Sequence, residues 1–299
     1  MAPGIKICCR WTFFSFVILL AFPWKVICGS EIEDLQMQID RAAKDQKSTL
    51  MVELAMVYIR EQNHEKAFKT FLEALSWIDE KKEIQPKPED VAIYEREANI
   101  YLTHNGANSN TVNAEKLEKE LKPLLSEHPD YYLTNFILAV SYANLGMYQE
   151  FMEAFYSSYR HFPQHYMAYK TKAILYIKLY ERSLNADEKE KNRKKIIDNV
   201  QKAMEKNGDD CALYKLRMMF AAEEEKTPIV SLYLNKIIDR PMIVARADIA
   251  FFVHQAVEEK LWNVAQRFID KAKETYQYSR VVLAAQEFLD KRKIRETNE

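Results

Sequence analysis

The sequence predicts an all-α protein built from repeated antiparallel helix pairs, and two observations support this fold class. Its 299 residues include only 5 Gly and 9 Pro, and 48% of them are hydrophobic, a composition that favours packed helices over turn-rich β structure or disorder. Residues of one type also recur at an offset of 34. The coincident pairs are Pro129 and Pro163, Ala139 and Ala173, and Tyr142 and Tyr176. A fixed period of this length is typical of stacked helical hairpins.

Each repeat carries a ladder of small and aromatic residues. A small residue is followed by an aromatic one three positions later, and then by small or apolar residues 9, 13 and 16 positions after the aromatic one. The small residues allow two helices to approach closely, and the aromatic rings fill the space between them. Two stretches fit this ladder: Ala55, Tyr58, Ala67, Phe71 and Ala74 in one, and Ala139, Tyr142, Phe151, Phe155, Ser158 and Pro163 in the other. Gly146 is expected to supply a left-handed turn between the helices of the second stretch.

This ladder resembles the tetratricopeptide repeat (TPR) family, over nearly all of the chain after residue 30. The resemblance implies a right-handed α-solenoid of antiparallel helix pairs. Its expected parts are a capping helix at 31–47, about six hairpins at 48–81, 91–131, 132–165, 166–210, 211–245 and 246–279, and a closing helix and tail at 280–299. The 211–245 hairpin is degenerate because Met218 replaces the small residue, and polar insertions interrupt two others at 103–113 and 185–195.

Residues 1–30 have the three-part layout of a secretory signal. Lys6 and Arg10 precede an apolar stretch at 11–24, and small residues follow at 28–30. As a helix the apolar stretch spans about 21 Å, less than the roughly 30 Å hydrocarbon core of a bilayer. The sequence therefore predicts a signal peptide that is cleaved near residue 30, and an exported protein that is periplasmic or secreted.

Two membrane-tethered alternatives remain open, an uncleaved signal and a lipidated Cys28. Lipidation fits poorly because Ile27, rather than a small residue, stands before the cysteine. Beyond Cys28 the chain holds one cysteine, Cys211, so the mature fold has no internal disulfide. Cys211 is interpreted as a small buried residue at a helix start, with a reactive thiol as the alternative.

The charge balance argues against nucleic acid as a partner. The first 30 residues hold three basic and no acidic side chains, so residues 31–299 hold 40 basic and 44 acidic ones, a net charge of −4. Such a chain has no general field that attracts polyanions. The basic run at 189–195 is interleaved with acidic residues and is interpreted as a solvated loop or helix face.

Motifs that carry chemistry are absent from the sequence. His161 and His165 have the spacing of a metal pair, but Pro163 stands between them, and the three are expected in a loop between helices. The acidic run at 223–225 is interpreted as the solvated end of a helix. We therefore expect no catalytic residue, no metal and no cofactor. An enzyme whose catalytic residues are scattered along the chain is the alternative.

The family resemblance implies a concave groove, lined by the first helix of each hairpin, that binds a peptide or partner helix. The residues expected to contact the partner are Arg60, Arg96, Asn99, Phe136, Asn144, Lys170, Lys178, Lys215 and His254. Neighbours expected on the same face are Glu53, Met56, Glu95, Val140, Ile174, Met219 and Phe251. The predicted function is a noncatalytic scaffold or assembly factor of the cell envelope or secretory space. Charge reversal at Lys170 and Lys178 is expected to weaken capture of the partner and to leave helicity unchanged.

Overall fold

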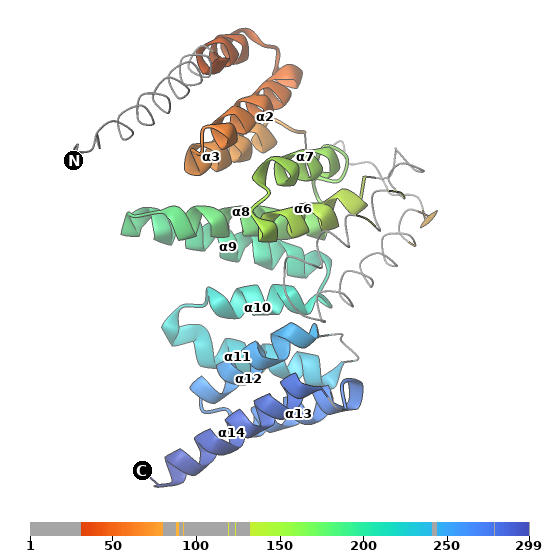
Figure 1. Cartoon of the computed structure of the whole chain (residues 1–299), viewed down its shortest axis with the longest axis vertical. Coiled ribbons are helices and arrows are strands. Elements are labelled where there is room, and N and C mark those ends of the chain that lie inside the picture. The colour runs from red at the N-terminus through yellow and green to blue at the C-terminus, as the bar shows by residue number, and fades with distance from the viewer. Residues whose placement is uncertain are drawn as a thin grey trace, which may run out of the picture. The chain divides into compact units, whose positions relative to one another are not determined.

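The computed structural model describes residues 31–79, 132–240, 244–277 and 279–298, with single positions at 88, 89, 92, 119 and 123. All regular secondary structure in these residues is helical. Contacts divide the chain into two units, Met1–Asp79 and Glu80–Glu299. The predicted signal at 1–30, the 103–113 insertion and, apart from these single positions, the 91–131 hairpin lie outside the described residues. Figure 1 labels the helices in chain order.

Unit 1 contains a helix at 31–41, α2 (Lys44–Arg60) and α3 (His64–Ser76). α2 and α3 pack as a hairpin, and the predicted ladder forms its core, since the exposed fraction is 2% at Tyr58 and 0% at Ala55 and the other three positions. The side chain of Asn63 caps α3 by accepting a hydrogen bond from the Lys66 N–H, which satisfies a free amide at the helix start.

The boundary between the capping helix and the first hairpin was predicted wrongly. The 31–41 helix ends before residue 47, and α2 begins at Lys44 rather than at residue 48. Ala43 adopts an extended conformation with ψ of 158° and breaks the helix there. Because neither Gly nor Pro marks this break, the helical pattern ran on through it.

Unit 2 is a stack of hairpins in chain order, shown in Figure 1 from α6 to α14. Its helices are α6 (Thr134–Leu145), α7 (Tyr148–Tyr159), α8 (Tyr166–Arg182), α9 (Ala186–Lys206), α10 (Cys211–Met219), α11 (Glu223–Asp239), α12 (Ile249–Glu258), α13 (Trp262–Thr275) and α14 (Arg280–Asn298). The pairs α6–α7, α8–α9, α10–α11 and α12–α13 form hairpins, and α14 packs against both α12 and α13. Among the described residues, the predicted all-α solenoid of helix pairs is confirmed.

The ladder also forms the core of unit 2. Ala139, Phe155 and Ser158 are fully buried, and Phe151 and Tyr142 are 1% and 6% exposed. Gly146 follows α6 with φ of 75°, the left-handed turn that the sequence predicted. Glycine adopts this conformation without the steric cost that a side chain imposes, so α7 can fold back directly onto α6.

The 185–195 insertion lengthens a helix rather than forming a loop. It lies in α9, where the side chain of Asn185 accepts hydrogen bonds from the N–H groups of Asp187 and Glu188. Two acidic residues in the first turn also stabilise the helix, because they lie near the positive end of the helix dipole. Farther along, Arg193 pairs with Glu190 and donates to the Phe220 carbonyl. The insertion therefore reaches across to the α10–α11 hairpin.

The acidic run at 223–225 opens α11 instead of ending a helix, which corrects the sequence-based interpretation. These three glutamates are exposed, and their position in the first turn suits the helix dipole. In the part of the chain that the structure describes, no helix is both long enough and apolar enough to cross a membrane.

Candidate functional site

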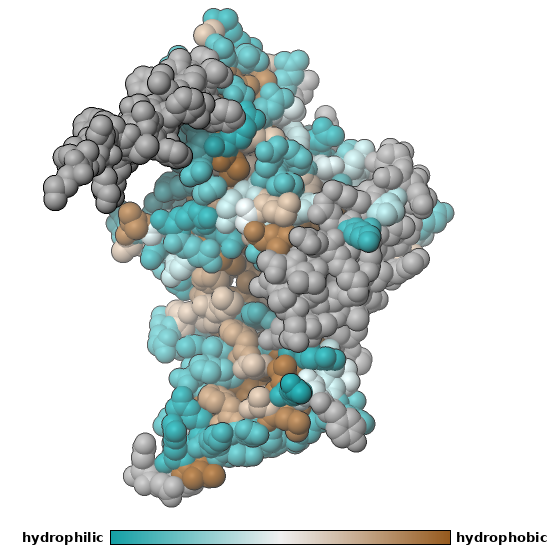
Figure 2. Space-filling view, in the orientation of Figure 1, coloured by the Kyte–Doolittle hydropathy of each residue, from teal (hydrophilic) through white to brown (hydrophobic). Residues whose placement is uncertain are grey.

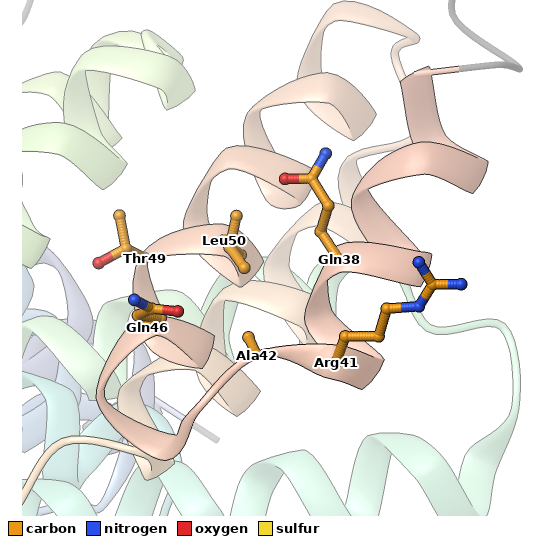
Figure 3. Close-up of a pocket in the computed structure, with 6 residues that line it drawn as sticks. All are labelled: Gln38, Arg41, Ala42, Gln46, Thr49 and Leu50. Carbon is orange, nitrogen blue, oxygen red and sulfur yellow. The ribbon is translucent and has the colours of Figure 1, made fainter.

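An open groove runs between the two antiparallel helices at the start of unit 1. We call it the seam groove. It consists of two hollows of about 470 and 560 Å³ that share Gln38. Its lining residues are Glu31, Asp34, Leu35, Gln38, Arg41 and Ala42 from the 31–41 helix and the turn after it, and Gln46, Thr49, Leu50, Glu53, Met56 and Arg60 from α2. Figure 3 shows the half of the groove around Gln38, Arg41 and Leu50.

Helical spacing explains why these residues line one groove. On each helix they recur three or four positions apart, which places them along a single face. The two helices run in opposite directions, so the start of one lies beside the end of the other. An ion pair fixes this register, because Arg60 Nη2 lies 2.5 Å from Glu31 Oε1. The seam groove is thus formed by the 31–41 helix and α2 as they are packed in the folded unit 1.

The seam groove has an apolar floor and charged rims. Leu35 is 8% exposed and Met56 is half-buried, so they form a partly covered apolar strip. Asp34 and Glu53 are exposed on the rims, near the Glu31–Arg60 pair. Arg41 lies toward the opposite end, with Gln46. Such a mixture of apolar floor and polar rim is typical of surfaces that bind proteins.

In unit 1 the structure brings together three residues that the sequence placed on the partner-binding face. Glu53, Met56 and Arg60 all line the seam groove. Arg60 is 40% exposed at its side chain and already holds Glu31. Arg96 and Asn99, like Glu95, lie outside the described residues. The 31–41 helix was predicted as a cap and not as a wall of the site, because its polar positions alone do not distinguish these two roles.

Lys170 and Lys215 hold consecutive hairpins together. Each is the fifth residue of its helix, α8 or α10. Each pairs with the aspartate that stands just before the first helix of the following hairpin. The Lys170–Asp210 distance is 2.6 Å and the Lys215–Asp248 distance is 2.5 Å. The side chain of Lys170 is only 11% exposed. Lys170 is therefore a structural residue of the stack, which corrects its predicted place in an exposed groove.

Phe136 was also predicted to contact a partner, and its burial shows that prediction to be wrong. Its ring is 0% exposed and lies 6.1 Å from the Phe155 ring and 5.7 Å from the His165 ring. Val140, one turn later, is 5% exposed. Eight of the twelve residues of α6 are hydrophobic, and two of its polar residues, Thr134 and Ser141, are buried as well, so the sequence carried no clear polar face to orient the helix. Phe136 belongs to the core that joins α6, α7 and α8.

The remaining predicted residues of unit 2 are accessible. Asn144 is exposed near the end of α6. The Lys178 side chain is 21% exposed and lies 3.6 Å from Glu181. His254 is exposed on α12, where its ring stacks 5.6 Å from that of Phe288. Phe288 lies on α14, and no repeat pattern indicated that this closing helix would reach the predicted face.

A second surface, which we call the C-terminal face, comprises Lys215, Met219, Phe251, His254 and Phe288. Met219 is 51% exposed, and the Lys215 ammonium lies 5.5 Å from the centre of the Phe251 ring. Figure 2 shows apolar and weakly polar side chains gathered over the level of α10 to α12, with hydrophilic ones beside them. This surface combines partly exposed phenylalanine rings with an exposed methionine, residue types that are enriched at protein interfaces, and with a lysine held over one of the rings.

His161 and His165 lie in the connection between α7 and α8, as predicted. His161 stacks on Tyr132 with the ring centres 3.8 Å apart. His165 caps α8, because its Nδ1 accepts a hydrogen bond from the Met167 N–H. Burial lowers the pKa of His165 to about 4. The imidazole is therefore neutral at pH 7, as its acceptor role requires. Among the described residues, His, Cys, Asp and Glu form no group of three that could hold a metal ion.

We expect unit 2 to lose stability as the pH falls from about 6.5 to about 4. His165 binds a proton near pH 6.5 when unfolded and near pH 4 when folded, so acid favours the unfolded chain by up to about 3 kcal/mol. Urea unfolding at pH 7 and pH 5 measures the effect. His165→Asn keeps a capping acceptor without titrating, and should flatten the pH dependence. An unchanged dependence in this variant would refute the assignment to His165.

The fold and these two surfaces define a class, an α-solenoid of antiparallel helix hairpins with accessible faces on its first helices. Among solved structures the chain is similar to the crystal structure of a thermophilic TPR protein from Thermus thermophilus, with 14% sequence identity and a TM-score of 0.44; the match covers 61% of this chain and 91% of that one. No protein-family model matches the sequence, and no curated protein matches it.

Proposed function

We propose that the protein is a noncatalytic scaffold that binds a segment of a partner protein along the first helices of its hairpins. The observation that carries this proposal is the seam groove, in which Glu53, Met56 and Arg60 face one open cleft of about 470 Å³. Grooves between helices bind partner helices through apolar anchors that recur every three or four residues. The C-terminal face offers a second contact surface on unit 2.

The chemistry of Cys211 supports a noncatalytic role. Its side chain is buried at the start of α10, as its sequence context predicted. Burial, together with the nearby Asp210 carboxylate, raises the pKa of the thiol to about 12. Because the thiolate is the nucleophile in cysteine chemistry, this thiol is unreactive at neutral pH. Its contribution is to the packing of α10 against its neighbours.

The proposed setting is the cell envelope or secretory space, reached by export. The support is the layout of residues 1–30, with Lys6 and Arg10 before an apolar stretch. Mass spectrometry of the N-terminus of the protein from its native cells tests this setting. A free amine at residues 29–31 is the expected result. An acylated Cys28 or an intact N-terminus would instead indicate a membrane-tethered assembly component.

Affinity capture with surface variants tests the scaffold role. Gln38→Trp fills the middle of the seam groove, and Met219→Asp places a charge on the C-terminal face. Both positions are exposed, so we expect each variant to keep its fold. At least one variant should capture the partner proteins of the wild-type chain roughly fivefold less or weaker still, which corresponds to a change of about 1 kcal/mol in binding free energy. Glu73→Ala on α3 is the control. Equal capture by all four chains would contradict the proposal.

A further inference from the structure

The net negative charge of residues 31–299 lies entirely in unit 1. Residues 31–79 hold ten acidic and six basic side chains, a net charge of −4, whereas residues 80–299 hold 34 of each. Residues 31–79 therefore attract cations, whereas residues 80–299 are balanced. A charge of one sign on a binding module raises the association rate of oppositely charged partners and disfavours like-charged ones.

The seam groove concentrates this charge beside an apolar strip. Asp34 on the 31–41 helix and Glu53 on α2 line the same hollow as Leu35 and Met56, and neither carboxylate has an ion pair within the described residues. The one cation in this half of the groove, Arg60, is held by Glu31 at 2.5 Å. Two carboxylates are thus available to a ligand, at the edges of a surface that also favours apolar side chains.

The dimensions of the groove suit a helix. Its α2 wall extends from Gln46 to Arg60, which corresponds to about 21 Å at 1.5 Å per residue. A partner helix of roughly 14 residues covers this length. Such a helix presents apolar residues every three or four positions to Leu35, Met56 and Leu50, and its flanking positions face the two rims.

We infer that the seam groove binds a basic amphipathic helix of a partner protein, with Lys or Arg side chains of that helix paired to Asp34 and Glu53. The inference rests on the proposed function and specifies the partner's chemistry. Arg41, toward the other end of the groove, disfavours a further cation there. The bound helix therefore places its basic residues over the Asp34–Glu53 half.

Synthetic peptides test the charge preference directly. The probes are two amphipathic peptides of about 18 residues with the same apolar stripe of leucines, one with Lys and one with Glu on the flanking positions. Binding to the full chain is followed by the methyl signal of Met56, which reports occupancy of the groove floor. The Lys peptide should shift this signal and bind at least about tenfold more tightly than the Glu peptide, a difference of 1.4 kcal/mol.

Two charge-matched variants separate local pairing from the general field of unit 1. Asp34→Lys with Glu53→Lys reverses the rims of the groove. Glu33→Lys with Glu73→Lys makes the same change in net charge at exposed positions that do not line it. The rim variant should lose at least about tenfold in affinity for the Lys peptide and gain affinity for the Glu peptide. The matched variant should stay within about threefold, and circular dichroism should show equal helicity for both.

The outcomes distinguish this inference from the broader proposal. Equal losses in the two variants would show that only the general field acts, and would overturn binding in the groove. Equal binding of the Lys and Glu peptides, or no shift at Met56 with either, would also overturn it. In these cases a partner captured through Met219 on the C-terminal face would leave the scaffold role intact. If both Gln38→Trp and Met219→Asp capture partners as well as the wild-type chain does, the proposed function itself is contradicted.

Discussion

Phe155→Ala will destabilise unit 2 by about 3–5 kcal/mol, the usual cost of removing a buried phenylalanine ring from a core. Phe155 is 0% exposed and lies 5.6–6.1 Å, centre to centre, from the rings of Phe136, Phe151 and Tyr159. Removing its ring leaves a cavity that three fixed aromatic neighbours cannot fill. Urea unfolding followed by circular dichroism measures the loss, and hydrogen exchange of α6 and α7 amides locates it.

The adjacent residue provides the control for this prediction. Tyr156 is on the same helix but only half-buried, with Arg160 packed over its ring. Tyr156→Ala should cost about 1 kcal/mol or less, as substitutions away from the core usually do. Similar losses in the two variants would contradict the assignment of the ladder positions to the core. Tyr159, three residues later, is 0% exposed, and its hydroxyl accepts a hydrogen bond from Lys172.

Lys170→Met will destabilise unit 2 by about 2–3 kcal/mol, because it leaves Asp210 as a nearly buried carboxylate without its cation. Asp210 binds the Lys170 ammonium through one oxygen, at 2.6 Å, and caps α10 through the other, which accepts from the Ala212 N–H. The same carboxylate therefore joins two hairpins and starts a helix. Urea unfolding measures the change in the free energy of unfolding.

A double-mutant cycle isolates the pair from the cap. Asp210→Asn removes the charge but keeps an acceptor for the Ala212 N–H, so Lys170→Met with Asp210→Asn should recover much of the lost stability. Lys178→Met, which removes a 3.6 Å contact to Glu181, should change stability by no more than about 0.5 kcal/mol. If Lys170→Met is as mild as Lys178→Met, the ion pair does not hold the hairpins together. Because of this ion pair, charge reversal at Lys170 would lower the stability of the fold in addition to any effect on partner binding.

The sequence predicted the parts of the fold that periodicity controls. Ala55 and Phe71, or Ala139 and Phe155, are buried because their spacing puts them on the shared face of a hairpin. Periodicity could not orient α6, in which nine of twelve residues are buried, two of them polar, so Phe136 was assigned to the wrong face. It also missed the break at Ala43, where an extended backbone interrupts a run of good helix formers.

The site was less predictable than the fold because side-chain pairing depends on the next hairpin. Lys170 and Lys215 have the spacing of groove residues, yet each meets an aspartate 33 or 40 positions later in the chain. The signal that could have found them is an aspartate at the N-cap position of the first helix of the following hairpin, Asp210 before α10 and Asp248 before α12. The seam groove could not be predicted without knowing where the 31–41 helix packs against α2, and the sequence identified that helix only as a cap.

Photo-crosslinking in the native cells tests the central claim most directly, because it reports which residues touch a partner in the full chain. A benzophenone side chain at Gln38 or Met56 should crosslink to a discrete protein partner, and the crosslinked peptide should be basic and amphipathic. The same group at Glu73, an exposed residue of α3, should give no such product. Crosslinks that appear at Glu73 and not at Gln38 or Met56 would contradict binding in the seam groove.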